Sequence, residues 1–196
     1  LAFNARRGQL RNPVVRRALN YAVDRQSLID TVMDGQGKAA VSPVWPEHCA
    51  YDISTSPFSY DPSLARAALA GAGFPASPPS KRLRLSCLIP NGFATVERLA
   101  LSLQRSLHDV GVDLSFESVT LAEMEARMAS GRFDAVLLDL LSGPSLSRVY
   151  SFWRSPGTFP GLNVFGYQDA EVDDALDRLR RTASESAIRA ATSQLQ

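Results

Sequence analysis

The strongest constraint on the fold is an alternation of strand and helix patterns in the middle of the chain. Apolar and polar residues alternate over 83–89, an amphipathic helix pattern covers 96–110, and alternation returns over 112–117. Another helix pattern follows Thr120, and residues 133–141 are nearly all apolar, as in a strand buried on both faces. Strands separated by helices favour parallel pairing with right-handed crossovers, so the sequence predicts an α/β fold.

Capping residues mark several further helices. Asn12 and Asp61 are each followed by proline, which suits the first helical position because its missing N–H is not needed there. The helix after Asn12 carries an apolar stripe, and a second short helix follows it and ends near Gly35. Residues 36–59 mix prolines with aromatic residues without any period, which predicts a long loop. Helices are also expected over 145–153, 169–181 and 184–196.

Composition is that of an ordinary globular chain. The 196 residues are 45% hydrophobic and 21% charged, and no apolar run approaches the roughly 18 residues needed to span a bilayer. The net charge of +1, without a basic stripe, argues against nucleic acid as a partner. The chain does not begin with Met and its last residues continue a helix pattern, so we expect a fragment of a larger protein. We interpret residues 1–196 as a single domain.

Residues with catalytic or metal-binding potential are few. Ser145 is not in a Gly-x-Ser-x-Gly turn, and the only histidines, His48 and His108, are not placed to activate it. There is no glycine-rich phosphate loop. Cys49 and Cys87 lack metal-ligand spacing, and a disulfide and two free thiols are both open for them. We therefore expect no enzyme activity, no cofactor and no metal site.

Four segments carry a recognisable pattern in a fixed order along the chain. The first joins Phe3-Asn4 to an Asn-Pro-x-Val-Arg-x-Ala-Leu-x-x-Ala-x-Asp-Arg run and a glycine. The others are a Tyr-Asp-Pro turn with its helix, a Gly-x-Phe-Asp turn before an apolar strand, and an Asn…Tyr…Glu-Val-Asp stretch before a helix that precedes Arg189. In this sequence they occupy residues 3–35, 60–73, 131–134 and 163–173. Together they resemble the extracytoplasmic solute-binding proteins of peptide and nickel ABC importers.

This resemblance implies a fold and a function. The expected fold is one lobe of a two-lobed periplasmic-binding-protein-like molecule, a mixed sheet flanked by helices, with Phe3 and Asn4 near the hinge and the other lobe and return strand missing. The implied function is to capture a peptide or other small polar solute by hinged closure and deliver it to a membrane permease. The resemblance also implies a bacterial periplasmic or extracytoplasmic location, with membrane association only through the permease or a lipid anchor outside this sequence.

The loop after the Gly-x-Phe-Asp strand departs from the family pattern. Peptide binders usually carry an acidic residue there that pairs with the peptide α-amino group, and the nearest match is Gly143. A free amino terminus would find no counter-charge, whereas serine hydroxyls in this loop suit a neutral polar ligand or a peptide held by its backbone. Helix capping by Ser142 or Ser145 and loop packing of Trp45 are the alternatives. The candidate ligand-binding residues are Trp45, Leu141, Ser142, Gly143, Ser145 and Ser147.

Two other functions stay open at this point. The same lobe fused to a DNA-binding domain would serve as the ligand-sensing module of a cytoplasmic transcriptional regulator. A serine hydrolase with Ser145 as nucleophile is the second alternative, although nothing around Ser145 favours it.

Overall fold

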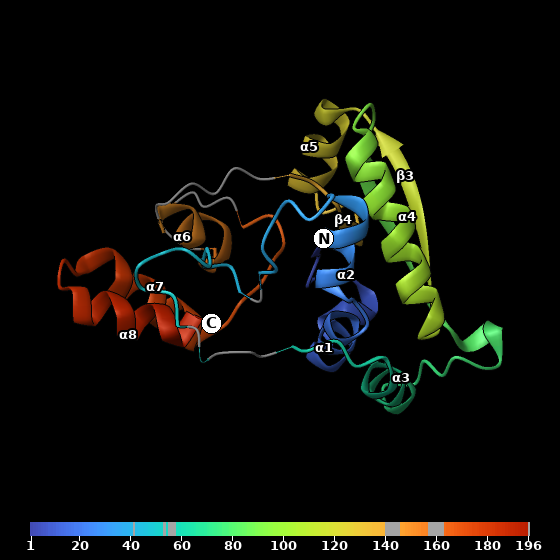
Figure 1. The fold of residues 1–196 in the computed structure, drawn as a ribbon, viewed down its shortest axis with the longest axis horizontal. Helices are drawn as coiled ribbons and strands as arrows, with labels where there is room; N and C mark the ends of the chain where they lie inside the picture. The colour runs from blue at the N-terminus through green and yellow to red at the C-terminus, as the bar shows by residue number, and fades with distance from the viewer. Residues whose placement is uncertain (41, 53, 55–57, 140–145, 157–162, 196) are drawn as a thin grey trace. The chain divides into compact units, whose positions relative to one another are not determined.

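The computed structural model describes the chain except residues 41, 53, 55–57, 140–145, 157–162 and 196 (Figure 1). The chain divides into two compact units. Unit 1 consists of residues 1–39 and 58–139, and unit 2 consists of residues 40–57 and 140–196. The chain therefore passes between the units three times. That residues 1–196 together make one lobe stays a prediction.

Unit 1 is built on a four-stranded sheet with the order β1-β4-β2-β3. Its strands are β1 (Ala2–Phe3), β2 (Leu83–Pro90), β3 (Val112–Val119) and β4 (Ala135–Val136). Strand β2 pairs in parallel with both β3 and β4, whereas β1 pairs with β4 in the antiparallel sense. The sheet is thus mixed and flanked by helices, which confirms the predicted fold class.

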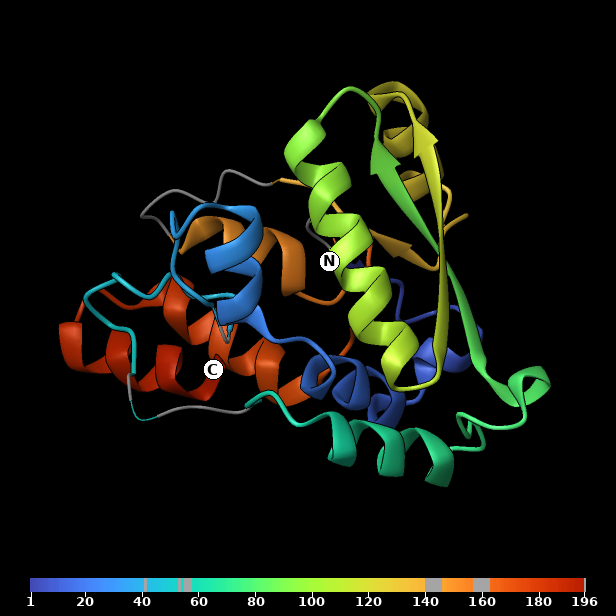
Figure 2. The same cartoon turned by 45° about the vertical axis from the view of Figure 1, so that its right-hand side comes forward.

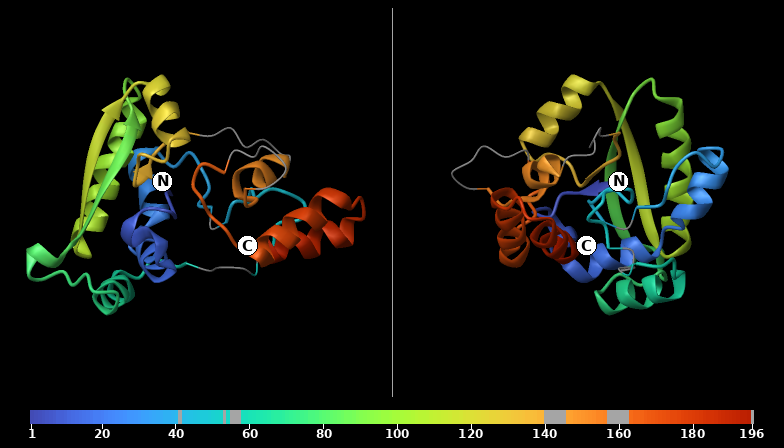
Figure 3. Two further views of the ribbon diagram at one scale, coloured as in Figure 1. Left: turned by 180° about the vertical axis from the view of Figure 1, so that it is seen from behind. Right: turned by 60° about the vertical axis from the view of Figure 1, so that its left-hand side comes forward.

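Helices cover both faces of β2 and β3. α4 (Ala94–Asp109) packs along both strands, and α5 (Leu121–Ala129) lies on their other side (Figure 3). The alternation of the strands explains this layering. Leu83, Leu85 and Leu114 are buried in the core shared with α4, while Glu117 points to α5, where its carboxylate lies 2.7 Å from Arg127 Nη1.

The remaining helices of unit 1 begin at capping residues. α1 (Pro13–Tyr21), α2 (Arg25–Val32) and α3 (Pro62–Gly71) complete its helices, with two short 3₁₀ turns at Gly8–Arg11 and Pro79–Lys81. Asn12 Oδ1 accepts the Val14 N–H at 2.9 Å, and Asp61 Oδ1 accepts the Leu64 N–H at 2.8 Å. Both predicted caps are confirmed. The Asp61 N–H also donates to the Tyr21 carbonyl at 2.9 Å, so the start of α3 is fixed to the end of α1.

Asn4 joins the first family segment to the third. Its side chain is fully buried, and Nδ2 donates to the carbonyls of Gly131 and Phe133, each at 3.1 Å. The Asn4 N–H donates to the Asp134 carbonyl at 2.8 Å. The Asp134 carboxylate in turn accepts the N–H and hydroxyl of Ser86 at 3.1 and 3.2 Å. The segments Phe3-Asn4 and Gly-x-Phe-Asp are therefore hydrogen-bonded to each other. Asp134 of the second segment also bonds to Ser86 of β2, so these bonds connect β1, β2 and the start of β4.

The predicted strand over residues 133–141 is wrong in its length. Within the described residues 133–139, only Ala135–Val136 pairs as a strand, followed by one further bond from the Leu137 N–H to the Leu88 carbonyl at 2.9 Å. Phe133 and Leu137 are buried on either side of this short strand. An apolar run predicts that its side chains are buried, and here the buried side chains extend beyond the two residues of β4 that pair with neighbouring strands.

The described part of unit 2 contains three helices, α6 (Ser147–Trp153), α7 (Ala170–Arg181) and α8 (Glu185–Leu195). α7 packs against both α6 and α8 (Figure 2). The segment 40–57 contributes two buried residues, Val44 and Ala50. The Ser193 hydroxyl of α8 donates to the Asp52 carboxylate at 2.9 Å, which attaches this segment to the helices.

Candidate functional site

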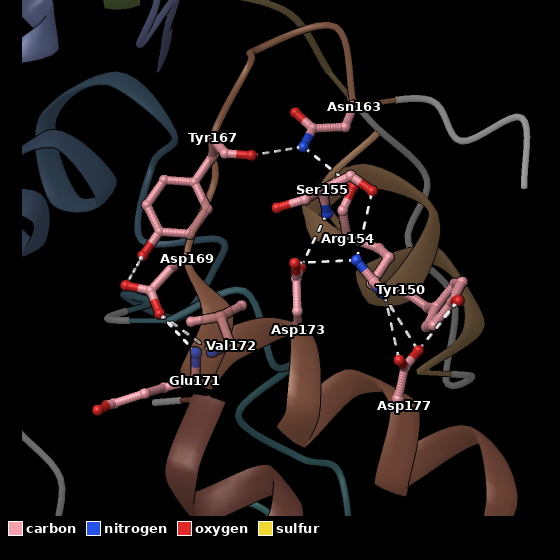
Figure 4. Close-up of polar contacts among 10 residues, drawn as sticks. All are labelled: Tyr150, Arg154, Ser155, Asn163, Tyr167, Asp169, Glu171, Val172, Asp173 and Asp177. Carbon is pink, nitrogen blue, oxygen red and sulfur yellow. Dashed lines mark hydrogen bonds and ion pairs between the residues drawn. The ribbon is translucent and has the colours of Figure 1, made fainter. Parts of the chain in front are cut away.

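An ion-pair cluster connects α6 to α7 in unit 2 (Figure 4). Arg154, directly after α6, places Nη1 2.9 Å from Asp173 and Nε 3.2 Å from Asp177. The Tyr150 hydroxyl also donates to Asp177 at 3.2 Å, and the Ser155 N–H donates to Asp173 at 2.9 Å. Both carboxylates are thus held by groups of the protein.

The electrostatics of this cluster stabilise its charged form. The hydrogen bond from Arg154 lowers the pKa of Asp177 below its usual range, and the same bond raises the pKa of Arg154. A carboxylate with a lowered pKa is a poor general base at neutral pH. The cluster therefore serves to position α6 on α7.

The buried amide of Asn163 connects the end of α6 to the chain that enters α7. Asn163 Nδ2 donates to the carbonyls of Arg154 and Tyr167 at 3.0 and 2.8 Å, as Figure 4 shows. Trp153 stacks on Phe165 with ring centroids 5.9 Å apart, and it meets Tyr167 edge-on at the same distance. These contacts explain the fourth family segment, whose Asn and Tyr hold the chain entering α7.

The start of α7 is capped by Asp169. Its Oδ1 accepts the N–H groups of Glu171 and Val172 at 2.9 and 3.2 Å, and the Tyr167 hydroxyl donates to its other oxygen at 3.3 Å. The helix is thereby fixed at its first turn, ahead of the residues that face α6.

A pocket of about 420 Å³ opens beside this cluster, entirely within unit 2. Its volume lies in the range of small-molecule sites, roughly 300–1,000 Å³. Tyr150 belongs both to the pocket wall and to the ion-pair cluster, so the cluster supports the wall. The lining residues are His48, Cys49, Leu146, Ser147, Tyr150, Leu176, Leu179, Arg180 and Ile188.

The polar groups of this lining are the His48 ring, the Cys49 thiol, the Ser147 and Tyr150 hydroxyls and the Arg180 guanidinium. His48 Nδ1 accepts the Ala50 N–H at 3.1 Å, which in the neutral ring leaves the proton on Nε2. The guanidinium carbon of Arg180 lies 5.2 Å from the centroid of the Tyr150 ring. All nine lining residues are described, and no Asp or Glu is among them.

The predicted ligand-binding residues are placed only in part. Ser147 lines the pocket at the start of α6. Trp45 is 43% exposed and is not in the lining, although its carbonyl accepts the His48 N–H at 2.9 Å. The other predicted residues, Leu141, Ser142, Gly143 and Ser145, lie outside the described part of the chain. The ligand-binding role of all six stays a prediction.

Sequence reasoning missed the residues that give the pocket its charge. Arg180 sits in an Arg-Leu-Arg-Arg run at the end of α7, where cations are common because they favour the carbonyl end of a helix. In the sequence, His48 was considered only as a catalytic residue or a metal ligand, and both roles were set aside. Neither residue carries a local signal of pocket lining, because the pocket forms from segments about 130 residues apart in the chain.

Metal and membrane features were searched among the described residues. No group of three or more His, Cys, Asp and Glu side chains there is arranged to hold a metal ion. Cys49 is exposed and Cys87 is buried, and both are free thiols. No helix in the described ranges has the length and apolarity to cross a membrane.

Comparison with known proteins identifies relatives along most of the chain. Heme-binding protein A of Haemophilus influenzae is 40% identical over 75 residues, covering 38% of this chain and 14% of that protein. The oligopeptide-binding protein AppA of Bacillus subtilis is 27% identical over 187 residues, covering 88% and 34%. The probable D,D-dipeptide-binding periplasmic protein DdpA of Escherichia coli is 24% identical, covering 95% and 35%. The chain thus spans about a third of the length of the last two.

The fold agrees with that of a solved relative. The structure of Bacillus subtilis AppA in complex with a nonapeptide matches 99% of this chain and 40% of that chain, with a TM-score of 0.85 and 24% identity. This likeness concerns the fold.

The family profile of bacterial extracellular solute-binding proteins, family 5, middle region, matches residues 1–159. That match covers the four strands and helices α1 to α6, whereas α7 and α8 lie beyond it. The relatives above are named for what they bind and not for a reaction they catalyse. The chain therefore belongs to family 5 of the bacterial extracellular solute-binding proteins.

Proposed function

We propose that this chain is part of the substrate-binding component of a bacterial ABC importer. The whole protein captures a peptide or other small polar solute and delivers it to a membrane permease. The observation that carries this proposal is the family match over residues 1–159. The names of AppA and DdpA, an oligopeptide binder and a probable D,D-dipeptide binder, support peptides as one solute class.

The proposed mechanism is closure of two lobes around the solute. Contacts made to both lobes favour the closed state, and the permease distinguishes closed from open. A chain that spans about a third of its relatives would hold one side of such a cleft. The solute would then stay hydrated on its other side, so the complete protein is needed for tight binding.

The proposed location is extracytoplasmic. The family is described as extracellular, and DdpA is named a periplasmic protein. The solute is proposed to be one that is not recognised through a free amino terminus, because residues 141–147 contain no Asp or Glu. N-acetylated peptides should then bind about as well as the unmodified peptides.

The test is a thermal shift of the full-length protein that contains this chain. We expect one or more members of a panel of di- to nonapeptides, with free and with acetylated amino termini, to raise Tm. A ligand at 100 times its Kd adds about 2.7 kcal/mol to the free energy of unfolding, which such a scan detects readily. No shift with any peptide, sugar or metal complex would contradict the proposal.

A further inference from the structure

We infer that unit 1 carries a docking surface for an acidic protein segment. This inference rests on the proposed solute-binding function, in which the permease is the protein partner, and it assigns the acidic segment to the permease. We call this surface the arginine face. It lies around the connection between β1 and β4 and consists of Arg6, Arg7, Arg11, Arg16 and Arg132.

Positive charge is concentrated in the first part of the chain. Residues 1–23 contain five arginines, four of them in the arginine face, and no Asp, Glu or Lys. The excess is local, because the whole chain carries a net charge of only +1. Elsewhere in unit 1, by contrast, Arg82 Nη1 lies 2.9 Å from the Asp113 carboxylate. Like charges on one surface repel one another, so such a surface attracts a partner of opposite charge.

Hydrogen bonds and packing bring the arginine face together. Arg11 Nε donates to the Arg6 carbonyl at 2.7 Å, and Arg16 Nη1 donates to the Arg11 carbonyl at 2.9 Å. The Arg6 guanidinium lies beside Gly131, where a Cβ would be 3.5 Å from Arg6 Nη2. Arg132 follows Gly131 directly, so the third family segment adds its arginine to those of the first.

Part of the arginine face has no counter-charge within the described chain. Asp134 lies 3.4 Å from Arg7 and pairs with that member of the face. Arg11 and Arg132 have no carboxylate partner among the described residues: Arg11 bonds to a carbonyl, and Arg132 Nε donates to the Ser130 hydroxyl at 3.0 Å. Both arginines are exposed. Their charges are therefore accessible to the carboxylates of a partner.

The fixed geometry favours protein carboxylates over a lipid surface. Arg11 and Arg16 are held by main-chain carbonyls, so less side-chain entropy is left to lose on binding. Guanidinium groups at set positions suit carboxylates at set positions, which a protein segment presents. An anionic bilayer attracts any polybasic segment, and its lipids diffuse, so it gains little from this arrangement.

The experiment measures binding of N-acetyl-hexaglutamate amide to the full-length protein by calorimetry, at low and at physiological salt. We expect Arg11→Gln combined with Arg132→Gln to weaken binding about fivefold or more at low salt, because two guanidinium groups without a carboxylate partner are lost. Added salt should weaken binding to the wild type, since the contacts are exposed.

The matched control combines Arg66→Gln with Arg98→Gln. Both arginines are exposed in unit 1, on α3 and α4, and Arg66 Nε also donates to a main-chain carbonyl, that of Asp109 at 3.0 Å. The control therefore removes the same charge without changing the arginine face. It should alter hexaglutamate affinity less than about twofold.

Two further arms identify the partner. Vesicles of phosphatidylcholine with phosphatidylglycerol test the lipid surface, and we expect weaker dependence on Arg11 and Arg132 there than with hexaglutamate. Uptake by cells whose only copy is the Arg11→Gln, Arg132→Gln variant tests the permease. A solute that raises Tm should bind this variant with unchanged affinity but enter the cells at least about twofold more slowly than with the control variant.

The outcomes separate this inference from the proposed function. Equal hexaglutamate affinity of the two double variants, binding to the lipid vesicles alone, or unchanged uptake each overturns the inference while solute binding stands. Competition between hexaglutamate and the solute that raises Tm also overturns it, because the arginines would then belong to the solute site. A protein that responds to no solute overturns the proposed function, and the assignment to the permease with it.

Discussion

Asn4 is a polar residue in a fully buried position, and both ends of its amide are used. Nδ2 reaches the carbonyls of Gly131 and Phe133, and Oδ1 accepts the Arg6 N–H at 3.2 Å. A buried polar side chain is tolerated only when its hydrogen bonds are made. The family pattern in the sequence predicts that Asn4 lies near a hinge. The hydrogen bonds show that Asn4 connects two segments of unit 1 that are far apart in the chain.

Replacing Asn4 by Ala should lower the free energy of unfolding by about 3 kcal/mol, because two carbonyls lose their donor in a buried site. Urea denaturation of the full-length protein measures the change. Asn91→Ala is the control, since Asn91 is exposed in the turn after β2, and it should cost less than about 0.5 kcal/mol. Equal effects of the two substitutions would show that the Asn4 bonds contribute little.

Whole elements were predicted best where a local signal marks their ends. Asn12 with Pro13, Asp61 with Pro62 and Thr120 each identified a helix start that the structure contains. The strand after Phe133 was predicted too long, because an apolar run reports burial and not the length of the pairing. The pocket could not be predicted at all from local patterns, since His48 and Arg180 come together only through tertiary packing.

The turn between α4 and β3 allows a sharp test at the scale of elements. Gly111 has φ +92°, and a Cβ there would lie 2.7 Å from the Ala76 Cα. Gly92, in the turn after β2, has φ +80° with open space around it. Substitution by Ala costs roughly 1–2 kcal/mol at both positions for the backbone conformation. At Gly111 the clash should add about 1–3 kcal/mol.

Chemical denaturation of the two alanine variants gives this difference directly, because the backbone cost is common to both. If Gly92→Ala were as damaging as Gly111→Ala, the close approach of the segment around Ala76 to the α4–β3 turn would not hold.

The contact between α6 and α7 should depend on pH. Asp177 has a lowered pKa in the folded state, so its pairing with Arg154 adds stability above the unfolded carboxyl pKa of about 3.9. This contribution is lost as pH falls through the lower folded value. Arg154→Gln should therefore cost about 1–2 kcal/mol at pH 7 and progressively less below about pH 4.

Unfolding curves of wild type and Arg154→Gln at pH 7 and at pH 3 test whether the loss of stability caused by the substitution becomes smaller in acid. The control is Arg189→Gln, whose pair with Glu185 on α8 is largely exposed and should contribute no more than about 0.5 kcal/mol. If Arg154→Gln lowered the free energy of unfolding more at pH 3 than at pH 7, the proposed stabilisation by the Arg154–Asp177 pair would be contradicted.

At the scale of the molecule, each compact unit carries one thiol. Cys49 of unit 2 is exposed, whereas Cys87 of unit 1 is buried in β2, and burial raises its pKa to about 12. The thiolate is the reactive form, so Cys87 is protected both by its burial and by its raised pKa. They can report on the two units separately.

Native protein treated with iodoacetamide at pH 8 should be modified at Cys49 and not at Cys87, as read by peptide mass spectrometry. Addition of denaturant should expose Cys87 when unit 1 unfolds. Rapid modification of Cys87 under native conditions would mean that β2 opens on the time scale of labelling, which its place in the core of unit 1 argues against.

The division into units also constrains how such a chain can change over evolution. Each unit is assembled from two separate stretches, and the chain passes between them three times. A single genetic crossover within residues 1–196 would therefore split at least one unit between two parents. Exchange of an intact unit 2 would need the 40–57 and 140–196 stretches to move together. Unit 2 should thus change more readily by point substitution than by shuffling of segments.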